Sequence, residues 1–330
     1  MRLSLYGGLL SLALLCTAAG SAQQHTLYMS ILSSHKFRLG AADNPIVGLF
    51  VSTDMGDTWI HRGWREYIRT FYSEVGPDGT VWSACGNGVL RSTDNGLTWK
   101  VTTGWQVTEV LKVRVDPTHA QRVYAATAYG VFRSTDLGAT WTEKNTGLRR
   151  PFTSDICIDR TRANTIFAAT EEGIFKSSDS GDHWSLAGLP GLSIRTIIQN
   201  PVKTSSFLAG TEDDGVFISI DRGATWAQKI KGLLHKTVYA IAVDPVNPSR
   251  IILGTHGGGI YRSVDGGNSW VQSSEGLKNL DVHSVVIVPS RPDTMFAGTL
   301  NGGLFRSTNG GANWEFNSQE DAQVWGLYVR

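Results

Sequence analysis

One recurring string combines residue types that can carry out acid–base chemistry. RSTDNGLTW (91–99) places an aspartate two residues after a serine, and a carboxylate beside a hydroxyl is a common arrangement for proton transfer. The string occurs seven times, however, and Asn309 replaces the aspartate in the last copy. A neutral amide accepts the same hydrogen bonds but cannot act as a general acid. We therefore interpret the strings as structural turns.

The seven copies are spaced 40 to 44 residues apart, which is typical of propeller blades or solenoid units. In each copy the carboxylate and hydroxyls can cap their own turn, glycine supplies a positive φ, and tryptophan can pack between neighbouring sheets. Seven of the 11 tryptophans fall at this one position, as repeated packing requires. The aligned residues are Asp54, Asp94, Asp136, Asp179, Asp221, Asp265 and Asn309, followed by Trp59, Trp99, Trp141, Trp184, Trp226, Trp270 and Trp314.

The segments around each string predict four short strands per unit, which we name A to D in chain order. VYAIAVDP (238–245) shows the A strand and its closing turn, and RVYAAT (122–127) shows a B strand. GVFRS (130–134) is typical of the C strand before the string, and the residues from the tryptophan onward form D.

These strings resemble the Asp-box, or BNR, repeats of sialidases, sortilin-type receptors, xyloglucanase-type glycosidases and photosystem II stability/assembly factors. The resemblance covers nearly the whole chain and is specific for the repeat, but the same repeat occurs in enzymes and non-enzymes. The organisation of the chain looks most like the assembly-factor branch of the family. That branch implies non-catalytic chaperone or scaffold work.

The two ends of the chain predict that the ring closes. TLYMSILS (26–33) aligns with the B strands and has no A strand before it, whereas QVWGLYV (323–329) aligns with the A strands. The C-terminal strand would therefore complete blade 1 and remove the unpaired edges of an open array. We expect an all-β fold, a single seven-bladed β-propeller of four-stranded antiparallel blades over residues 23–330.

Residues 1–22 have the features of a secretory signal peptide, with a basic start, an apolar run and small residues before a cut at Gln23. The run is interrupted by glycines and short for a membrane helix, and the bulky Leu15 before Cys16 disfavours lipidation. We expect a secreted or periplasmic protein with no transmembrane segment.

Charge and motifs exclude several function classes. Without residues 1–22 the chain has 29 basic and 29 acidic side chains, which argues against a general nucleic-acid or membrane-surface binder. No His-x-His, His-Glu-x-x-His or Cys-x-x-Cys occurs, so we expect no metal and no cofactor. Cys85 and Cys157 fall in non-adjacent units, and we expect a monomer without a disulfide.

The predicted binding face is the one where the A strands begin. The B–C and D–A connections of all blades converge there, and we name it the connection face. A ring of side chains at its centre can stack on and hydrogen-bond an anionic or sugar-like ligand, or can simply fill the channel mouth. Alignment of the A strands predicts that this ring consists of Arg69, Leu111, Ser154, Arg195, Tyr239, His283 and Trp325.

The connections predict a polarised face suited to oriented docking, although solvated loop charge explains any single residue equally well. The longest connection, SHKFRLGAADNPIV, belongs to blade 1 and can reach over the channel. Acidic residues come from blades 4 and 5, namely Glu171, Glu172, Glu212, Asp213 and Asp214. Basic residues and tryptophans come mainly from blades 1 to 3, namely His35, Lys36, Arg38, Arg62, Trp64, Arg65, Trp105, Arg149 and Arg150.

The leading hypothesis is a secreted or periplasmic, non-catalytic binding or scaffold module that docks a protein or carbohydrate on this face. The alternative is a glycosidase. FRLG (37–40) is similar to the sialidase Phe-Arg-Ile-Pro motif but lacks its proline, and xyloglucanase-type enzymes place their carboxylates between two propellers. A glycosidase would use Asp155, Tyr239, Glu172 and Asp213, and its two carboxylates would have to lie about 5–10 Å apart.

Overall fold

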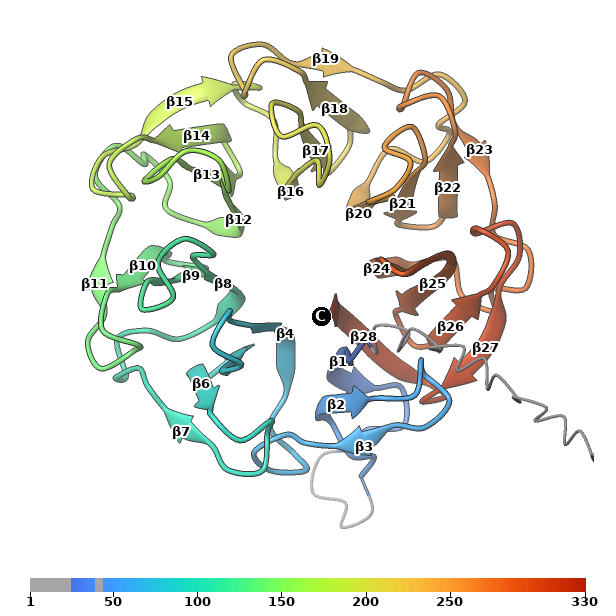
Figure 1. Ribbon diagram of the computed structural model, residues 1–330, viewed down its shortest axis with the longest axis horizontal. Coiled ribbons are helices and arrows are strands. Elements are labelled where there is room, and N and C mark those ends of the chain that lie inside the picture. The colour runs from blue at the N-terminus through green and yellow to red at the C-terminus, as the bar shows by residue number, and fades with distance from the viewer. Residues whose placement is uncertain (1–24, 39–43) are drawn as a thin grey trace, which may run out of the picture.

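The computed structural model describes residues 25–38 and 44–330, which form a ring of seven antiparallel four-stranded sheets (Figure 1). The predicted all-β, seven-bladed propeller is therefore confirmed. The predicted signal peptide lies outside the described residues. Within residues 25–38 and 44–330 no helix is long and apolar enough to cross a membrane.

In every blade one strand lines the centre of the ring, two follow outward, and a short strand lies at the rim (Figure 1). The innermost strands are β28 (Ala322–Val329), β4 (Thr70–Val75), β8 (Val110–Val115), β12 (Thr153–Ile158), β16 (Ile194–Gln199), β20 (Val238–Val243) and β24 (Val282–Val288). The second strands are β1 (Leu27–Ser34), β5 (Val81–Cys85), β9 (Val123–Thr127), β13 (Ile166–Thr170), β17 (Phe207–Thr211), β21 (Ile251–Thr255) and β25 (Arg291–Thr299).

The outer half of each blade is the hairpin that contains the repeated string. The third strands are β2 (Gly48–Ser52), β6 (Gly88–Ser92), β10 (Gly130–Ser134), β14 (Gly173–Ser177), β18 (Val216–Ser219), β22 (Gly259–Ser263) and β26 (Gly303–Ser307). The rim strands are β3 (Ile60–His61), β7 (Lys100–Val101), β11 (Thr142–Glu143), β15 (Ser185–Gly188), β19 (Ala227–Gln228), β23 (Val271–Gln272) and β27 (Glu315–Ser318).

Blade 1 combines both ends of the chain, as predicted. β28 pairs antiparallel with β1 from Leu27 opposite Val329 to Ser34 opposite Ala322. Beyond the strands, the His25 ring nitrogen Nδ1 lies 2.8 Å from the Arg330 carbonyl oxygen. The ring is therefore closed by backbone hydrogen bonds between segments that lie at opposite ends of the sequence.

Hydrophobic clusters fill the space between adjacent blades. The second strands are short apolar runs that are buried on both faces, as expected for sheets packed between two others. Between blades 4 and 5 the Phe167 and Phe207 rings lie 4.7 Å apart by their centroids, and neither ring is exposed. Each blade therefore depends on its two neighbours for a complete core.

The repeated strings form turns with the predicted internal hydrogen bonds, and we name residues 52–59 and their six equivalents the repeat turns. In blade 2 the Ser92 hydroxyl donates to Asp94 Oδ1 (2.7 Å), and the Thr98 N–H donates to the same oxygen (2.8 Å). In blade 7 the Asn309 Oδ1 accepts from the Ser307 hydroxyl (2.9 Å). The neutral amide therefore accepts the same hydrogen bond as the carboxylate, as expected for a structural turn.

The tryptophans of the repeat turns connect neighbouring blades. The Trp99 indole N–H donates to the Arg62 carbonyl (2.7 Å), which belongs to the rim of blade 1. Trp184 makes the equivalent bond to the Lys144 carbonyl (2.7 Å). Five of the seven indoles have an acceptor, and among the described residues those of Trp141 and Trp226 have none.

The repeat turns predict a specific acid sensitivity. Hydrogen bonds from the Thr98 side chain and backbone lower the pKa of Asp94 to about 2, and the carboxyls of four other turns behave alike. Because the unfolded value is about 3.9, this contribution is complete well above pH 4 and is lost as the pH falls through about 2.

We expect the melting temperature to be constant near neutral pH and to fall between about pH 4 and 2. Replacing Asp94, Asp136 and Asp221 by Asn should lower it at pH 7 and flatten this acid limb. Circular dichroism melts from pH 7 to 2 measure both effects. An unchanged acid limb in the triple variant would show that other carboxyls cause it.

Candidate functional site

Each innermost strand contains one residue that lacks a partner in the next strand. In β8, Val110 pairs with Thr127 and Lys112 with Ala126, so Leu111 is a bulge residue. All seven innermost strands have this register shift at the same level. Side chains normally point to alternate faces of a sheet, and a bulge interrupts this alternation and turns one side chain in a new direction. The seven bulge residues line one cavity of about 340 Å³, the mouth cavity, and are Phe71, Leu111, Ser154, Arg195, Tyr239, His283 and Trp325.

The structure places six of the seven residues of the predicted ring at this level and corrects the seventh. In blade 2 the position belongs to Phe71, and Arg69 precedes β4. The Arg69 guanidinium instead lies over the Phe37 ring, 4.7 Å from its centroid, and the side chain is exposed. The position predicted for blade 2 was wrong by two residues. All seven innermost strands have the same bulge, but the closing turn of blade 2 begins with Gly76, where blades 3 to 6 have Asp or Asn, so the alignment from the closing turns had no matching residue there.

Half of the mouth cavity is a continuous aromatic wall, which we name the aromatic arc. The Phe71 and Trp325 rings meet edge to face with centroids 5.5 Å apart, and Trp325 lies 4.7 Å from His283. His283 stacks on Tyr239 at 4.4 Å with an angle of 25°. Burial lowers the pKa of His283 to about 4, so its ring is neutral near pH 7 and packs as an aromatic group.

The other half of the mouth is polar. Arg195 from β16 forms an ion pair with Glu212, and the Ser154 hydroxyl donates to the Ile194 carbonyl (2.7 Å). Glu109 and Lys112 also line this side. Lys112, like Tyr239 and His283, lines both the mouth cavity and a second cavity of about 380 Å³ further along the channel.

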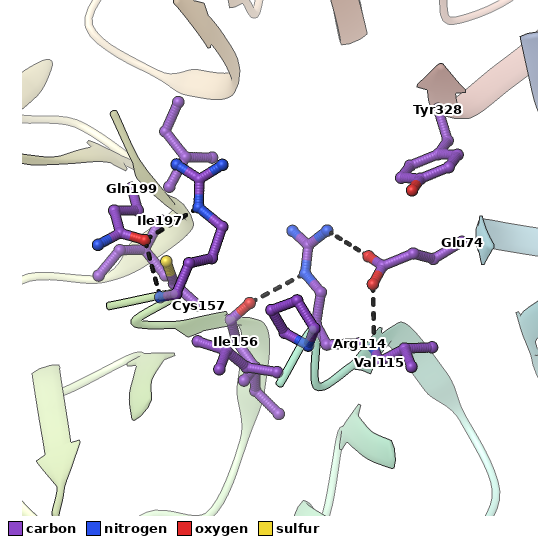
Figure 2. Close-up of a pocket in the computed structure, with 12 residues that line it drawn as sticks. Glu74, Arg114, Val115, Ile156, Cys157, Ile197, Gln199 and Tyr328 are labelled. Carbon is purple, nitrogen blue, oxygen red and sulfur yellow. Dashed lines mark hydrogen bonds and ion pairs between the residues drawn. The ribbon is translucent and has the colours of Figure 1, made fainter. Parts of the chain in front are cut away.

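A buried ionic cluster lies in the channel wall below the mouth (Figure 2). The Arg114 guanidinium donates to Glu74 (3.0 Å), to Asp155 (2.9 Å) and to the Tyr72 hydroxyl (2.8 Å). Its Nε donates to the Ile156 carbonyl (2.9 Å), and Figure 2 shows this bond together with the one to Glu74. Arg114 therefore joins the innermost strands of blades 2, 3 and 4. Sequence reasoning missed it, although two cations in the strand VLKVRV were a usable signal.

The four glycosidase candidates do not converge. Asp155 is fully buried, and its second carboxylate oxygen accepts from the Thr196 hydroxyl at 3.0 Å, so both oxygens are used for structure. Glu172 lies 3.6 Å from Arg150, Asp213 is exposed, and Tyr239 belongs to the aromatic arc. Among the described residues that line the mouth cavity, Glu109 is the only carboxylate.

The connections of blades 1 to 3 carry exposed aromatic residues. Trp105 is 84% exposed and Tyr67 is 72% exposed, which is unusual for such large rings. Tyr129 and Trp64 are also exposed, and all four belong to D–A or B–C connections of blades 1 to 3. Sequence reasoning named the two tryptophans and missed the two tyrosines.

The predicted charges of this face are distributed more widely than expected. Arg62 lies at the blade rim beside Trp99, away from the mouth cavity. Lys36 pairs with Asp321 (2.8 Å) and Arg150 with Glu172 (3.6 Å), so part of the expected polarity is neutralised between blades. Arg38, Arg65 and Arg149 are exposed.

The long connection of blade 1 is described over residues 34–38 and 44–47. None of its described residues lines the mouth cavity. Within residues 25–38 and 44–330, no group of three or more His, Cys, Asp or Glu side chains could hold a metal ion.

Comparisons place the fold among known propellers. No family model matches the chain, and no curated protein matches it. The GH74 enzyme of Niastella koreensis superposes with a TM-score of 0.70 at 17% identity, over 83% of this chain and 51% of that chain. The GH74 xyloglucanase from Xanthomonas campestris gives 0.70 at 15% identity, over 90% and 53%. YCF48 bound to a D1 peptide gives 0.59 at 15% identity, over 80% and 94%.

These similarities concern the fold. The chain spans about half the length of the two GH74 enzymes and nearly the full length of YCF48. The same architecture therefore serves a glycosidase and a protein observed with a bound peptide. The choice between these functions has to come from the site itself.

Proposed function

We propose that this chain is an exported, non-catalytic binding module that docks a segment of a partner protein at the mouth cavity. The observation that carries the proposal is the bulge ring, in which seven different blades direct a side chain into one opening. The aromatic arc supplies a rigid apolar wall, and the exposed aromatic residues in the connections of blades 1 to 3 offer further contact surface on the same face. Tyrosine and tryptophan contribute most to protein interfaces because they bury large areas at low entropic cost.

Two further observations support peptide docking over hydrolysis. Most glycosidases need two carboxylates flanking one bond, and among the described residues the mouth is lined by one. YCF48, which has the same fold and a similar length, holds a peptide. The resemblance of the repeat turns to the Asp-box family, and of the whole to its assembly-factor branch, fits a scaffold role.

Photo-crosslinking from opposite faces of one blade tests the proposal. A crosslinking amino acid at Trp105 lies on the connection face, and one at Leu97, which is 66% exposed, lies in the repeat turn of the same blade. In the cells that make the protein, we expect a defined adduct from position 105 and none from 97. Equal adducts from both positions would contradict docking on the connection face.

The glycosidase alternative rests on the similarity of the fold to GH74 enzymes, and it can be tested by measuring the turnover of glycoside substrates. Fluorogenic sialosides and β-glucan oligosaccharides should show no turnover. Turnover that disappears in Tyr239→Phe would support the enzyme and contradict our proposal. Tyr239→Phe suits this purpose because it keeps the stacking ring.

A further inference from the structure

Lys112 is the only lysine or arginine among the described residues that lines both the mouth cavity and the second cavity. It directly follows the bulge residue of β8. The ammonium lies over the Tyr72 ring, 4.0 Å from the centroid. Any ligand that passes the aromatic arc therefore meets this cation at the bottom of the mouth.

The carboxylates closest to Lys112 in the channel are committed to another cation. Glu74 and Asp155 both accept hydrogen bonds from Arg114, at 3.0 and 2.9 Å. Within residues 25–38 and 44–330, no carboxylate lies within ion-pair distance of the Lys112 ammonium. A half-buried cation without a counter-ion is costly, and an anionic ligand would remove that cost.

The charged and titratable groups facing Lys112 come from seven blades. Among these described residues, Glu109 is the only acidic one that does not pair with Arg114 or Arg195. They are Glu109 before β8, Tyr72 and Glu74 from β4, Arg114 from β8, Asp155 from β12, Arg195 from β16 with Glu212, Tyr239 from β20, His283 from β24 and Tyr328 from β28.

We propose that Lys112 anchors a carboxylate of the docked segment, while the adjoining side chain of that segment packs on the aromatic arc. The inference rests on the proposed function and names the chemistry that the mouth selects. The mouth cavity of about 340 Å³ is at the small end of ligand sites, which suits one side chain with its carboxylate. The carboxylate can belong to a chain terminus or to an Asp or Glu side chain.

Such an anchor couples binding to protonation. Burial lowers the pKa of Lys112 to about 8. A bound carboxylate favours the ammonium and raises this pKa, so affinity should be nearly constant between about pH 5.5 and 7, where the ligand is ionised, and should decrease as the pH rises through 8. At pH 8.5 binding should take up roughly three-quarters of a proton, because the free amine is then mostly neutral.

Three short peptides provide the test by isothermal titration calorimetry. Acetyl-Gly-Gly-Phe with a free carboxylate probes the terminus, acetyl-Gly-Glu-Phe-amide probes a side chain, and acetyl-Gly-Gly-Phe-amide lacks the charge. We expect one of the two carboxylate peptides to bind at least about tenfold more tightly than the uncharged amide. The peptide that binds more tightly shows whether the anion belongs to a chain terminus or to a side chain.

Variants assign the effect to Lys112. Lys112→Met should reduce the preference for carboxylate about tenfold, and Lys112→Arg should keep it while removing proton uptake at pH 8.5. Lys100→Met, at an exposed lysine on the rim strand β7, is the matched control and should change neither. Thermal melts show whether each variant is folded, and proton uptake by the wild-type protein tests the coupling independently of any variant.

Two outcomes would overturn the inference. One is equal binding of the acid and amide peptides, or no binding of either. The other is a carboxylate preference that persists in Lys112→Met. In both cases the crosslinking experiment at position 105 still decides the proposed function, so the two proposals fail separately.

Discussion

Deletion of residues 321–330 is expected to abolish cooperative thermal unfolding. The deletion removes the whole of β28, which contributes Ala322, Val324 and Leu327 to the cluster shared by blades 1 and 7. Burial of each large aliphatic side chain contributes about 1.5–3 kcal/mol, and a typical domain is stable by only about 5–15 kcal/mol. The deletion also leaves β1 as an unpaired edge in the middle of the protein.

Differential scanning calorimetry measures the effect. The control removes Arg330 alone, which breaks the terminal contacts with His25 and Thr26 and one side-chain hydrogen bond to the Pro77 carbonyl, and should keep a single sharp transition. A truncated chain that melts like the full-length protein would disprove closure through β28. Addition of a synthetic peptide with the sequence of residues 321–330 should restore part of the transition.

Arg114→Met is expected to destabilise the protein by about 3–5 kcal/mol at pH 7, since it leaves two carboxylates in the channel wall without their cation. Asp155 is inaccessible to solvent and the Glu74 side chain is 13% exposed, so water can replace little of the lost interaction. Chemical denaturation measures the loss.

A double variant distinguishes this mechanism from lost packing. Arg114→Met combined with Asp155→Asn should be more stable than the sum of the two single effects predicts, because one of the unpaired charges is removed. A strictly additive loss would mean that only packing was removed.

The same cluster changes how the glycosidase hypothesis can be tested. Asp155→Asn would weaken the junction of three blades, so any lost activity could follow from lost structure. Tyr239 is a better position, because its hydroxyl can be removed while its ring still stacks on His283.

The architecture could be predicted from the sequence because the same turn signal occurs seven times. A turn with Ser, Asp, Gly and Trp at fixed spacing needs no distant partner to be recognised, and the alignment of residues 26–33 with 323–329 indicated how the ring closes. Six positions of the bulge ring followed from counting along similar strands. Arg69 was misplaced because the closing turn of blade 2 begins with Gly76 and lacks the Asp or Asn that marks the same position in blades 3 to 6.

The ionic cluster and Lys112 were harder to predict. Glu74, Arg114 and Asp155 are about 40 residues apart in sequence and meet only because the blades are arranged in a ring. Each residue alone resembles an ordinary polar position of a strand. These three side chains interact only because the ring closes. The repeat pattern predicts the ring, but it does not predict which side chains meet in the channel.

Closure through blade 1 also constrains how the chain is made. His25 and Arg330 are 305 residues apart and touch in the finished ring. At about 5–20 residues per second, a ribosome needs tens of seconds to synthesise the chain between them. During that time β1 has no inner partner and the first blade cannot be completed. Blade 1 can therefore be completed only after residues 322–329 have been synthesised, whereas blades 2 to 7 consist of consecutive strands that can pair as the chain emerges.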